Sequence, residues 1–292
     1  MALLTLLGLY LFQRNILTQR GGTDLSAILV RLIVPCVILR SFLTVAPSPE
    51  TRRLILVSTL CALCALLLSM LVSALAFGRR RPVHHFSAAF SNAGFMGIPL
   101  VEAVLGSGAV LLIAPFIALL NLFQWTYGLF VLTGEKRHLS ARAIARNPVL
   151  LSFAGGLLVF FLQIPVPDVL TDTIGAVAQM NTPVAMICLG MLMRRVNWAS
   201  LWRDGPAWAC AFLRLLVIPG LTAVLLRLLP WAEETVCVAV LIAASAPVGS
   251  NVAVFAQLYG RATDDAVKAV TLSTLLCAFS MPLILTLNAY LL

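Results

Sequence analysis

The sequence has few charged residues, and this scarcity excludes most classes of protein. Charged side chains make up 11% of the 292 residues, whereas 61% are hydrophobic and the mean hydropathy is +1.02. Soluble domains carry about 25% charged residues, and a soluble chain of this length has no core large enough to bury so much apolar surface. The same values exclude disordered and disulfide-rich secreted proteins. The composition therefore indicates a membrane protein.

The sequence also lacks the residue patterns that catalysis and metal binding need. It contains no nucleophile–base pair, metal-ligand cluster or phosphate-binding glycine loop, so we expect no enzyme, no organic cofactor and no metal. The seven cysteines lie inside apolar runs, and we interpret them, the Cys61–Cys64 pair included, as small hydrophobic side chains. The net charge of +9 comes from basic residues that separate apolar runs, which argues against a nucleic-acid partner.

Long apolar runs fill almost the whole chain. Because a spanning helix uses about 20 residues, we predict ten transmembrane helices, which are at about 1–12, 25–45, 53–77, 84–106, 109–133, 147–164, 168–193, 206–229, 234–260 and 264–291. The run Met1–Phe12 lacks the basic region and cleavage site of a signal peptide, so we interpret it as a short first span or one whose N-terminal part is missing.

The basic residues between these runs predict an orientation. Of 20 lysines and arginines, 14 lie in the odd-numbered loops, three in the even-numbered loops and three inside spans. By the positive-inside rule the odd-numbered loops are cytoplasmic, so we expect both termini outside the cytoplasm of a bacterial inner membrane. His84 and His85 follow the basic run Arg79–Arg81, and we expect them to belong to its solvated face.

The two halves of the chain, 1–140 and 141–292, carry matched helix breakers. Pro35 and Pro183 are 148 residues apart, as are Pro99 and Pro247, although an offset of 154, which pairs Gly106 with Gly260, is also open. Five spans in each half predict an inverted repeat, and interrupted spans at corresponding positions indicate the binding site of a transporter. Such breaks survive in a membrane only where protein or a water-filled cavity satisfies the backbone.

The motifs around these breaks resemble those of a known transporter family. The sequence NAGFMGIPL at 92–100 resembles the fourth-span motif of the auxin efflux carrier family, and APVGSNVAVFA at 246–256 resembles the ninth-span motif. Asn147-Pro148 and Thr182-Pro183 fit the family as well, and the resemblance covers the whole chain. It includes bacterial members described as malonate or malate permeases.

The resemblance implies an all-α membrane fold like that of sodium/proton antiporters and bile-acid symporters. Spans 4 and 9 would be broken and would cross at their unwound centres. Spans 1, 2, 6 and 7 would form a scaffold, and spans 3–5 and 8–10 a moving transport unit.

Polar side chains inside the spans are candidate site residues, because polar groups are costly in a bilayer. For substrate binding these are Asn92, Asn251, Asn121, Gln124 and Arg214. The alternatives are that Asn92 and Asn251 only cap half-helices, that Asn121 and Gln124 bond neighbouring helices, and that Arg214 meets a lipid headgroup.

A second group of residues concerns the breaks and ion coupling. We expect the geometry of the breaks to depend on Gly94, Gly97, Pro99, Pro247 and Gly249. Glu102 is either a group that binds a coupling proton or an acid at the membrane interface.

These observations predict a secondary transporter that moves a small organic anion, a carboxylate such as malonate, malate or an auxin-like acid, by alternating access. The expected partners are this anion, the lipid bilayer, a coupling proton or sodium ion and, in a homodimer, a second copy of the chain. A sodium-coupled bile-acid-type symporter, a channel and a membrane receptor are the alternatives.

Overall fold

Helices occupy all ten of the expected apolar runs. The computed structural model describes residues 2–44, 48–135, 147–193 and 198–291, and these residues form no β-strand beyond one isolated bridge. In the first half the helical segments are α1 (Ala2–Gln13), α2 (Gln19–Ile28), η1 (Leu29–Ile33), α3 (Val34–Leu43), α4 (Pro49–Phe77), α5 (Pro82–Ala89), η2 (Ala93–Gly97), α6 (Ile98–Leu105), η3 (Ser107–Ala109), α7 (Val110–Phe123), η4 (Gln124–Gly128) and α8 (Leu129–Thr133).

The second half of the chain also consists of helices with internal interruptions. Its helical segments are α10 (Pro148–Leu162), α11 (Asp168–Gln179), α12 (Asn181–Met193), α13 (Trp198–Leu201), α14 (Gly205–Phe212), η6 (Leu213–Val217), α15 (Ile218–Arg227), α16 (Glu234–Ser245), α17 (Asn251–Leu258) and α18 (Thr263–Leu291). The predicted run at 168–193 is therefore two helices, α11 and α12, which meet at Met180.

Five helices in the described part of the chain are long and apolar enough to cross a membrane: 19–43, 49–77, 107–133, 205–227 and 263–288. Shorter apolar helices lie at 93–105, 148–162 and 234–245. Large apolar side chains on the outer faces are exposed, Leu75 and Phe279 each by 79%. Such surfaces suit lipid and not water, and the chain is a multi-pass membrane protein.

Local sequence signals set several helix starts. Ser48 and Thr51 form a capping box at the start of α4, where Pro49 occupies the first turn. Asn147 caps α10, and its side chain accepts a hydrogen bond of 2.9 Å from the Val149 N–H. These side chains satisfy N–H groups that have no partner within the helix.

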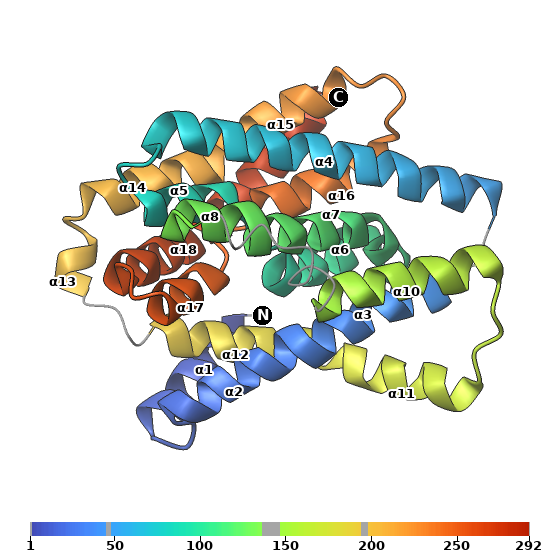
Figure 1. Cartoon of the computed structure of the whole chain (residues 1–292), viewed down its shortest axis with the longest axis horizontal. Helices are drawn as coiled ribbons and strands as arrows, with labels where there is room; N and C mark the ends of the chain where they lie inside the picture. The colour runs from blue at the N-terminus through green and yellow to red at the C-terminus, as the bar shows by residue number, and fades with distance from the viewer. Residues whose placement is uncertain (1, 45–47, 136–146, 194–197, 292) are drawn as a thin grey trace.

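The helices pack in two groups (Figure 1). One group contains α1, α2, α3, α10, α11 and α12, and the other contains α4–α8 and α14–α18. In the first group α1 and α12 approach so closely that a Cβ atom on Gly8 would overlap the Ile187 carbonyl oxygen. Small residues permit such close contact between helices in a membrane.

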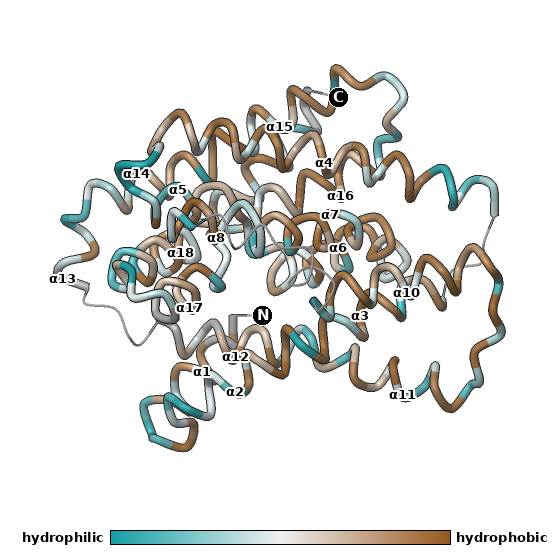
Figure 2. Tube along the Cα trace, viewed as in Figure 1, coloured by the Kyte–Doolittle hydropathy of each residue, from teal (hydrophilic) through white to brown (hydrophobic). Residues whose placement is uncertain are grey.

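Hydrophilic residues gather at the ends of the helices, and the interiors of the helices are mostly apolar (Figure 2). The connections before α5 and α14 lie at the left of the view, and the connection between α10 and α11 lies at the right (Figure 1). Alternate loops thus reach opposite ends of the bundle. Several of the basic residues counted for the predicted orientation lie outside the described residues, namely Lys136, Arg137, Arg142, Arg146, Arg194 and Arg195.

Candidate functional site

The fourth and ninth apolar runs are each interrupted by a short non-helical stretch, and the two stretches pair with each other. The chain is non-helical at 90–92, between α5 and η2, and at 246–250, between α16 and α17. The Asn92 N–H donates to the Pro247 carbonyl over 2.7 Å, and the Gly249 N–H donates to the Phe90 carbonyl over 3.0 Å. The stretches run antiparallel, and we call their contact the crossing. Backbone groups freed by the two breaks therefore satisfy each other inside the protein.

Two of the predicted breakers lie in the crossing itself. Pro247 supplies a carbonyl to the pairing, and Gly249 permits the close approach. A Cβ atom on Gly249 would lie 3.1 Å from the Ser91 carbonyl oxygen and 3.4 Å from that of Phe90. The other three follow the first break: Gly94 and Gly97 belong to the π-helical turn η2, and Pro99 lies in the first turn of α6.

The four predicted amide residues line one small cavity beside the crossing. Asn92 and Asn251 enter it from the two breaks, and Asn121 and Gln124 enter it from α7 and η4. Its volume is about 30 Å³, which is room for little more than a water molecule. Its opposite wall is apolar and comes from the other helix group, through Val30 and Val34 together with Val149.

The amides differ in how far their hydrogen bonds are satisfied. Asn251 Nδ2 donates to Gln124 Oε1 over 3.0 Å, and Asn121 Nδ2 donates to the Ile117 carbonyl of its own helix over 2.9 Å. Asn92 is 5% exposed, and its Nδ2 has no hydrogen-bond partner among the described residues. An unsatisfied buried donor is costly, and the Asn92 amide is free to donate a hydrogen bond into the cavity.

π-helical turns occur at four places around this site in the described part of the chain. η1 contains Val30, η2 follows Asn92, η4 begins at Gln124, and η6 contains Arg214. A π-helical turn inserts an extra residue into an α-helix and is frequent at functional sites. Here the turns shift the register of the helices that carry Gln124 and Arg214. No feature in the sequence analysis predicted them.

Arg214 binds the C-terminal ends of both broken helices and does not line the amide cavity. Arg214 is 1% exposed. Its Nη1 donates to the Ala88 carbonyl over 3.0 Å and to Ser69 Oγ over 3.1 Å. Nη2 donates to the Ala244 carbonyl. The C-terminal end of a helix has carbonyl groups without donors and carries a partial negative charge. The Arg214 guanidinium group donates hydrogen bonds to such carbonyls of α5 and α16 and places a positive charge beside both helix ends. The predicted pairing of Arg214 with a substrate carboxylate stays a prediction.

Ser273 of α18 also supports the crossing. The Val248 N–H donates to Ser273 Oγ over 3.0 Å, and this hydroxyl donates in turn to the Val270 carbonyl of its own helix. Neither Ser273 nor Ser69 was a predicted site residue, because a serine inside a spanning helix carries no sequence signal that separates this role from bonding within its own helix.

Glu102 lies in a different cavity, of about 290 Å³. Glu102 of α6 shares it with Arg40 of α3 and with Asn181 at the start of α12. Asn181 is 3% exposed, and neither Oδ1 nor Nδ2 has a hydrogen-bond partner in the described part of the chain. The cavity is lined by both helix groups and combines an acid, a cation and an unsatisfied amide. Asn181 was not a predicted site residue.

The histidines near the basic run are not solvated, so the expectation of a solvated face was wrong for them. His84 is 4% exposed and His85 5%. His85 Nδ1 is 3.1 Å from the Gly78 carbonyl, and its Nε2 is 3.1 Å from the Tyr127 hydroxyl. Because α5 packs against α4, α14 and α18, its first turn is enclosed by protein.

Comparison with known proteins identifies the family of the chain. No curated protein matches the chain. The family model described as membrane transport protein, which is that of the auxin efflux carriers, matches residues 1–285. The resemblance seen in the motifs at 92–100 and 246–256 is thereby confirmed, and the chain belongs to the membrane transport protein family of the auxin efflux carriers.

Proposed function

We propose that the protein is a secondary transporter of a small organic anion, a carboxylate such as malonate, malate or an auxin-like acid. The observation that carries the proposal is the buried, unpartnered Nδ2 of Asn92 at the crossing. A carboxylate accepts hydrogen bonds only, so it complements an amide donor that the protein leaves unsatisfied.

The polarity of the broken helices supports an anion. The N-terminal end of η2–α6 lines the amide cavity through Gly94 and Phe95, and α17 presents its first residue, Asn251, to the same cavity. Helix N-termini carry a partial positive charge. The negative C-terminal ends of α5 and α16 meet on Arg214 instead, away from the cavity.

The same arrangement argues against a sodium ion at the crossing. Sodium in carriers of broken helices is coordinated by unwound carbonyls and helix C-termini. Here the Ala88 and Ala244 carbonyls already accept from Arg214. The sodium-coupled bile-acid-type symporter is thus the less favoured alternative. If an ion is coupled, we propose a proton, with Glu102 as the acid that carries it.

Transport would proceed by alternating access between the two helix groups. We propose that α1–α3 and α10–α12 are the scaffold and that α4–α8 and α14–α18 move against it. We also propose that the chain consists of two inverted five-helix repeats, 1–140 and 141–292, and that each repeat contributes helices to both groups. Each of the two helix groups forms one wall of the amide cavity. Since about 30 Å³ is too small for a dicarboxylate, the groups must separate for substrate to bind.

The proposed cellular setting follows from the charged loops. We propose a bacterial inner membrane, with the odd-numbered loops in the cytoplasm and both termini outside it. We propose no cofactor, and assembly as a homodimer stays a prediction.

The test is uptake into proteoliposomes of radiolabelled malonate, malate and indole-3-acetate. Asn92→Ala and Asn251→Ala should lower uptake at least about tenfold, which corresponds to about 1.4 kcal/mol. Gln13→Ala is the matched control, because Gln13 is an exposed amide at the end of α1. Wild-type uptake by both folded variants would contradict the proposed site. Counterflow that saturates with substrate separates a carrier from a channel.

A further inference from the structure

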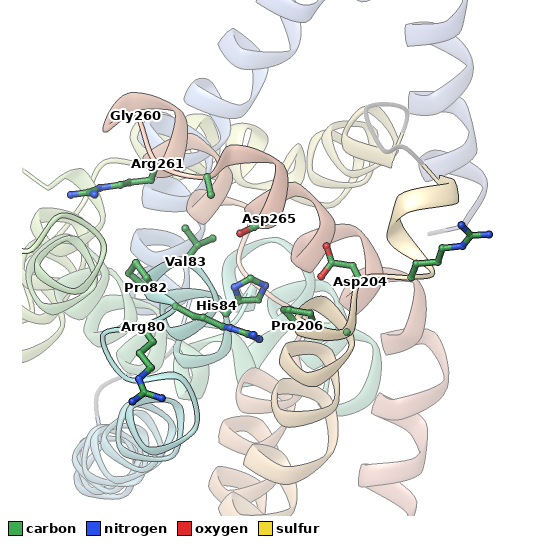
Figure 3. A pocket seen from close by; sticks show the side chains of 13 residues that line it. Arg80, Pro82, Val83, His84, Asp204, Pro206, Gly260, Arg261 and Asp265 are labelled. Carbon is green, nitrogen blue, oxygen red and sulfur yellow. The ribbon is translucent and has the colours of Figure 1, made fainter.

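A cavity of about 720 Å³ lies apart from the crossing and is strongly basic (Figure 3). Four arginines line it, Arg80, Arg81, Arg203 and Arg261, and all four are exposed. It shares no lining residue with the amide cavity or with the cavity of Glu102. Its walls come from α5, α14, α18 and the loops before them, and hence from one helix group only.

The positive charge in this cavity is only partly balanced. None of the four arginines has a carboxylate partner within the described ranges. Of the two acids in the wall, Asp204 is already paired, at 3.0 Å from Lys268 Nζ. Partial burial raises the pKa of Asp204, but the bonds from the Ala207 N–H and from Lys268 outweigh it and hold the pKa below its ordinary value. Of the four guanidinium groups, that of Arg261 also donates to the Thr133 carbonyl over 2.7 Å. Asp265 is the other acid in the wall, so the four arginines outnumber the acids that line the cavity.

A buried polar group also faces the cavity. His84 lines it and is 4% exposed, yet its Nε2 has no hydrogen-bond partner in the described part of the chain. The ring of Phe77 lies against the imidazole, with centroids 5.8 Å apart, and helps to fix its orientation. Figure 3 shows the His84 ring close to Asp265, with the Arg80 and Arg261 side chains extending away from the ring. Burial of a ring nitrogen without a partner is unfavourable unless a ligand supplies one.

Three helices begin at this cavity. Pro82 starts α5, Gly205 starts α14, and Ala262 immediately precedes α18, and all three residues line the wall. Helix N-termini add partial positive charge to that of the arginines. Arginine forks bind the oxygens of phosphate in pairs, and phosphate carries up to two negative charges and several acceptors. The volume lies within the range of small-ligand sites, about 300–1,000 Å³, and exceeds what bare phosphate needs.

We propose that this basic cavity binds a phosphate-bearing anion through Arg80, Arg81, Arg203, Arg261 and His84. The phosphate belongs either to a soluble phosphate ester or to the headgroup of an anionic phospholipid. In either case the site is separate from the proposed substrate site at the crossing. An occupant would bind the starts of α5, α14 and α18 together, and α5 leads directly into the crossing.

The test measures binding and stability without any transport reading, so its result is independent of the proposed carrier function. The full chain is placed in nanodiscs of phosphatidylcholine, and glycerol 3-phosphate is titrated by calorimetry at constant ionic strength set with sodium chloride. In a second arm the nanodiscs contain phosphatidic acid, and the unfolding temperature is compared with that in phosphatidylcholine alone. Binding in the first arm identifies a solute, and stabilisation in the second arm alone identifies a lipid headgroup.

The variants are the pair Arg81→Gln with Arg203→Gln and the matched pair Arg52→Gln with Arg53→Gln at the start of α4. Both pairs remove two exposed arginines, so both should fold. The first pair should weaken binding at least about tenfold, or about 1.4 kcal/mol, and the second should leave it unchanged. The proposal is overturned if neither arm shows binding beyond that of sodium chloride, or if both pairs weaken it equally.

Discussion

The Asn251 amide donates to the Gln124 side chain over 3.0 Å and thereby joins the start of α17 to the π-helical turn η4, across 127 residues of sequence. The bond fixes two of the four amides that surround the amide cavity. Asn92 Nδ2, by contrast, has no hydrogen-bond partner among the described residues. The contact between Asn251 and Gln124 therefore holds one side of the amide cavity, and Asn92 is the residue that we propose to bind the substrate.

The contact between Gln124 and Asn251 predicts that the two side chains act as a unit. Gln124→Ala and Asn251→Ala should each weaken transport, and the double variant should be little worse than either single one. The coupling energy should be about 1 kcal/mol, because removal of either partner already breaks the bond. The coupling energy is obtained from the initial uptake rates of the wild type, the two single variants and the double variant. The control is Thr23→Ala, which removes a hydroxyl bonded within its own helix, and its effect should add to that of Asn251→Ala. If the effects of Gln124→Ala and Asn251→Ala also add, the prediction is contradicted.

Gly249→Ala should disturb the crossing. The new Cβ atom would lie 3.1 Å from the Ser91 carbonyl oxygen, and backbone on both sides would have to move. We expect a loss of about 1–3 kcal/mol in stability, as for overpacking in a core, together with loss of transport. Thermal unfolding in detergent checks the first effect. Gly220→Ala is the control, since a Cβ atom there meets nothing within 4 Å, and equal effects of the two substitutions would refute the argument.

Arg214→Met should be strongly destabilising. It leaves the carbonyls of Ala88 and Ala244 without this donor, and each buried unsatisfied group costs about 1–3 kcal/mol. Arg214→Lys keeps the charge but not the fork that reaches both helix ends, so its stability should be intermediate. Unfolding temperatures measure the series. Arg31→Met, at an exposed arginine in a spanning helix, should have little effect; a stability loss of the same size there would remove the special role of Arg214.

Glu102→Gln should abolish any dependence of uptake on the proton gradient, if Glu102 binds the coupling proton. The amide has the shape of the acid but cannot take up and release a proton. Uptake by proteoliposomes is measured with and without an acid exterior, at constant sodium. Glu50→Gln, at an exposed acid in the first turn of α4, is the control. Unchanged dependence on the gradient in Glu102→Gln would assign Glu102 a structural role.

The few charged residues and long apolar runs by themselves determined that the chain is an all-helical membrane protein, because burial of backbone in lipid leaves helices as the structure for such runs. The position of the second break was also determined locally: Pro247 removes a backbone donor and Gly249 weakens a helix, and both lie where α16 gives way to α17. The first break, at 90–92, contains neither proline nor glycine. The motifs at 92–100 and 246–256 indicated the family.

Only the tertiary structure decided what those breaks contact. The pairing of Asn92 with Pro247, and the position of Arg214 on both helix ends, depend on packing between segments more than 100 residues apart. The burial of His84 depends on packing in the same way. A basic or polar side chain has the same sequence signal whether it meets solvent, a ligand or a carbonyl, since its environment is supplied by other helices. The register shifts of η4 and η6 direct Gln124 and Arg214 to their partners, and such shifts have no local signature in composition.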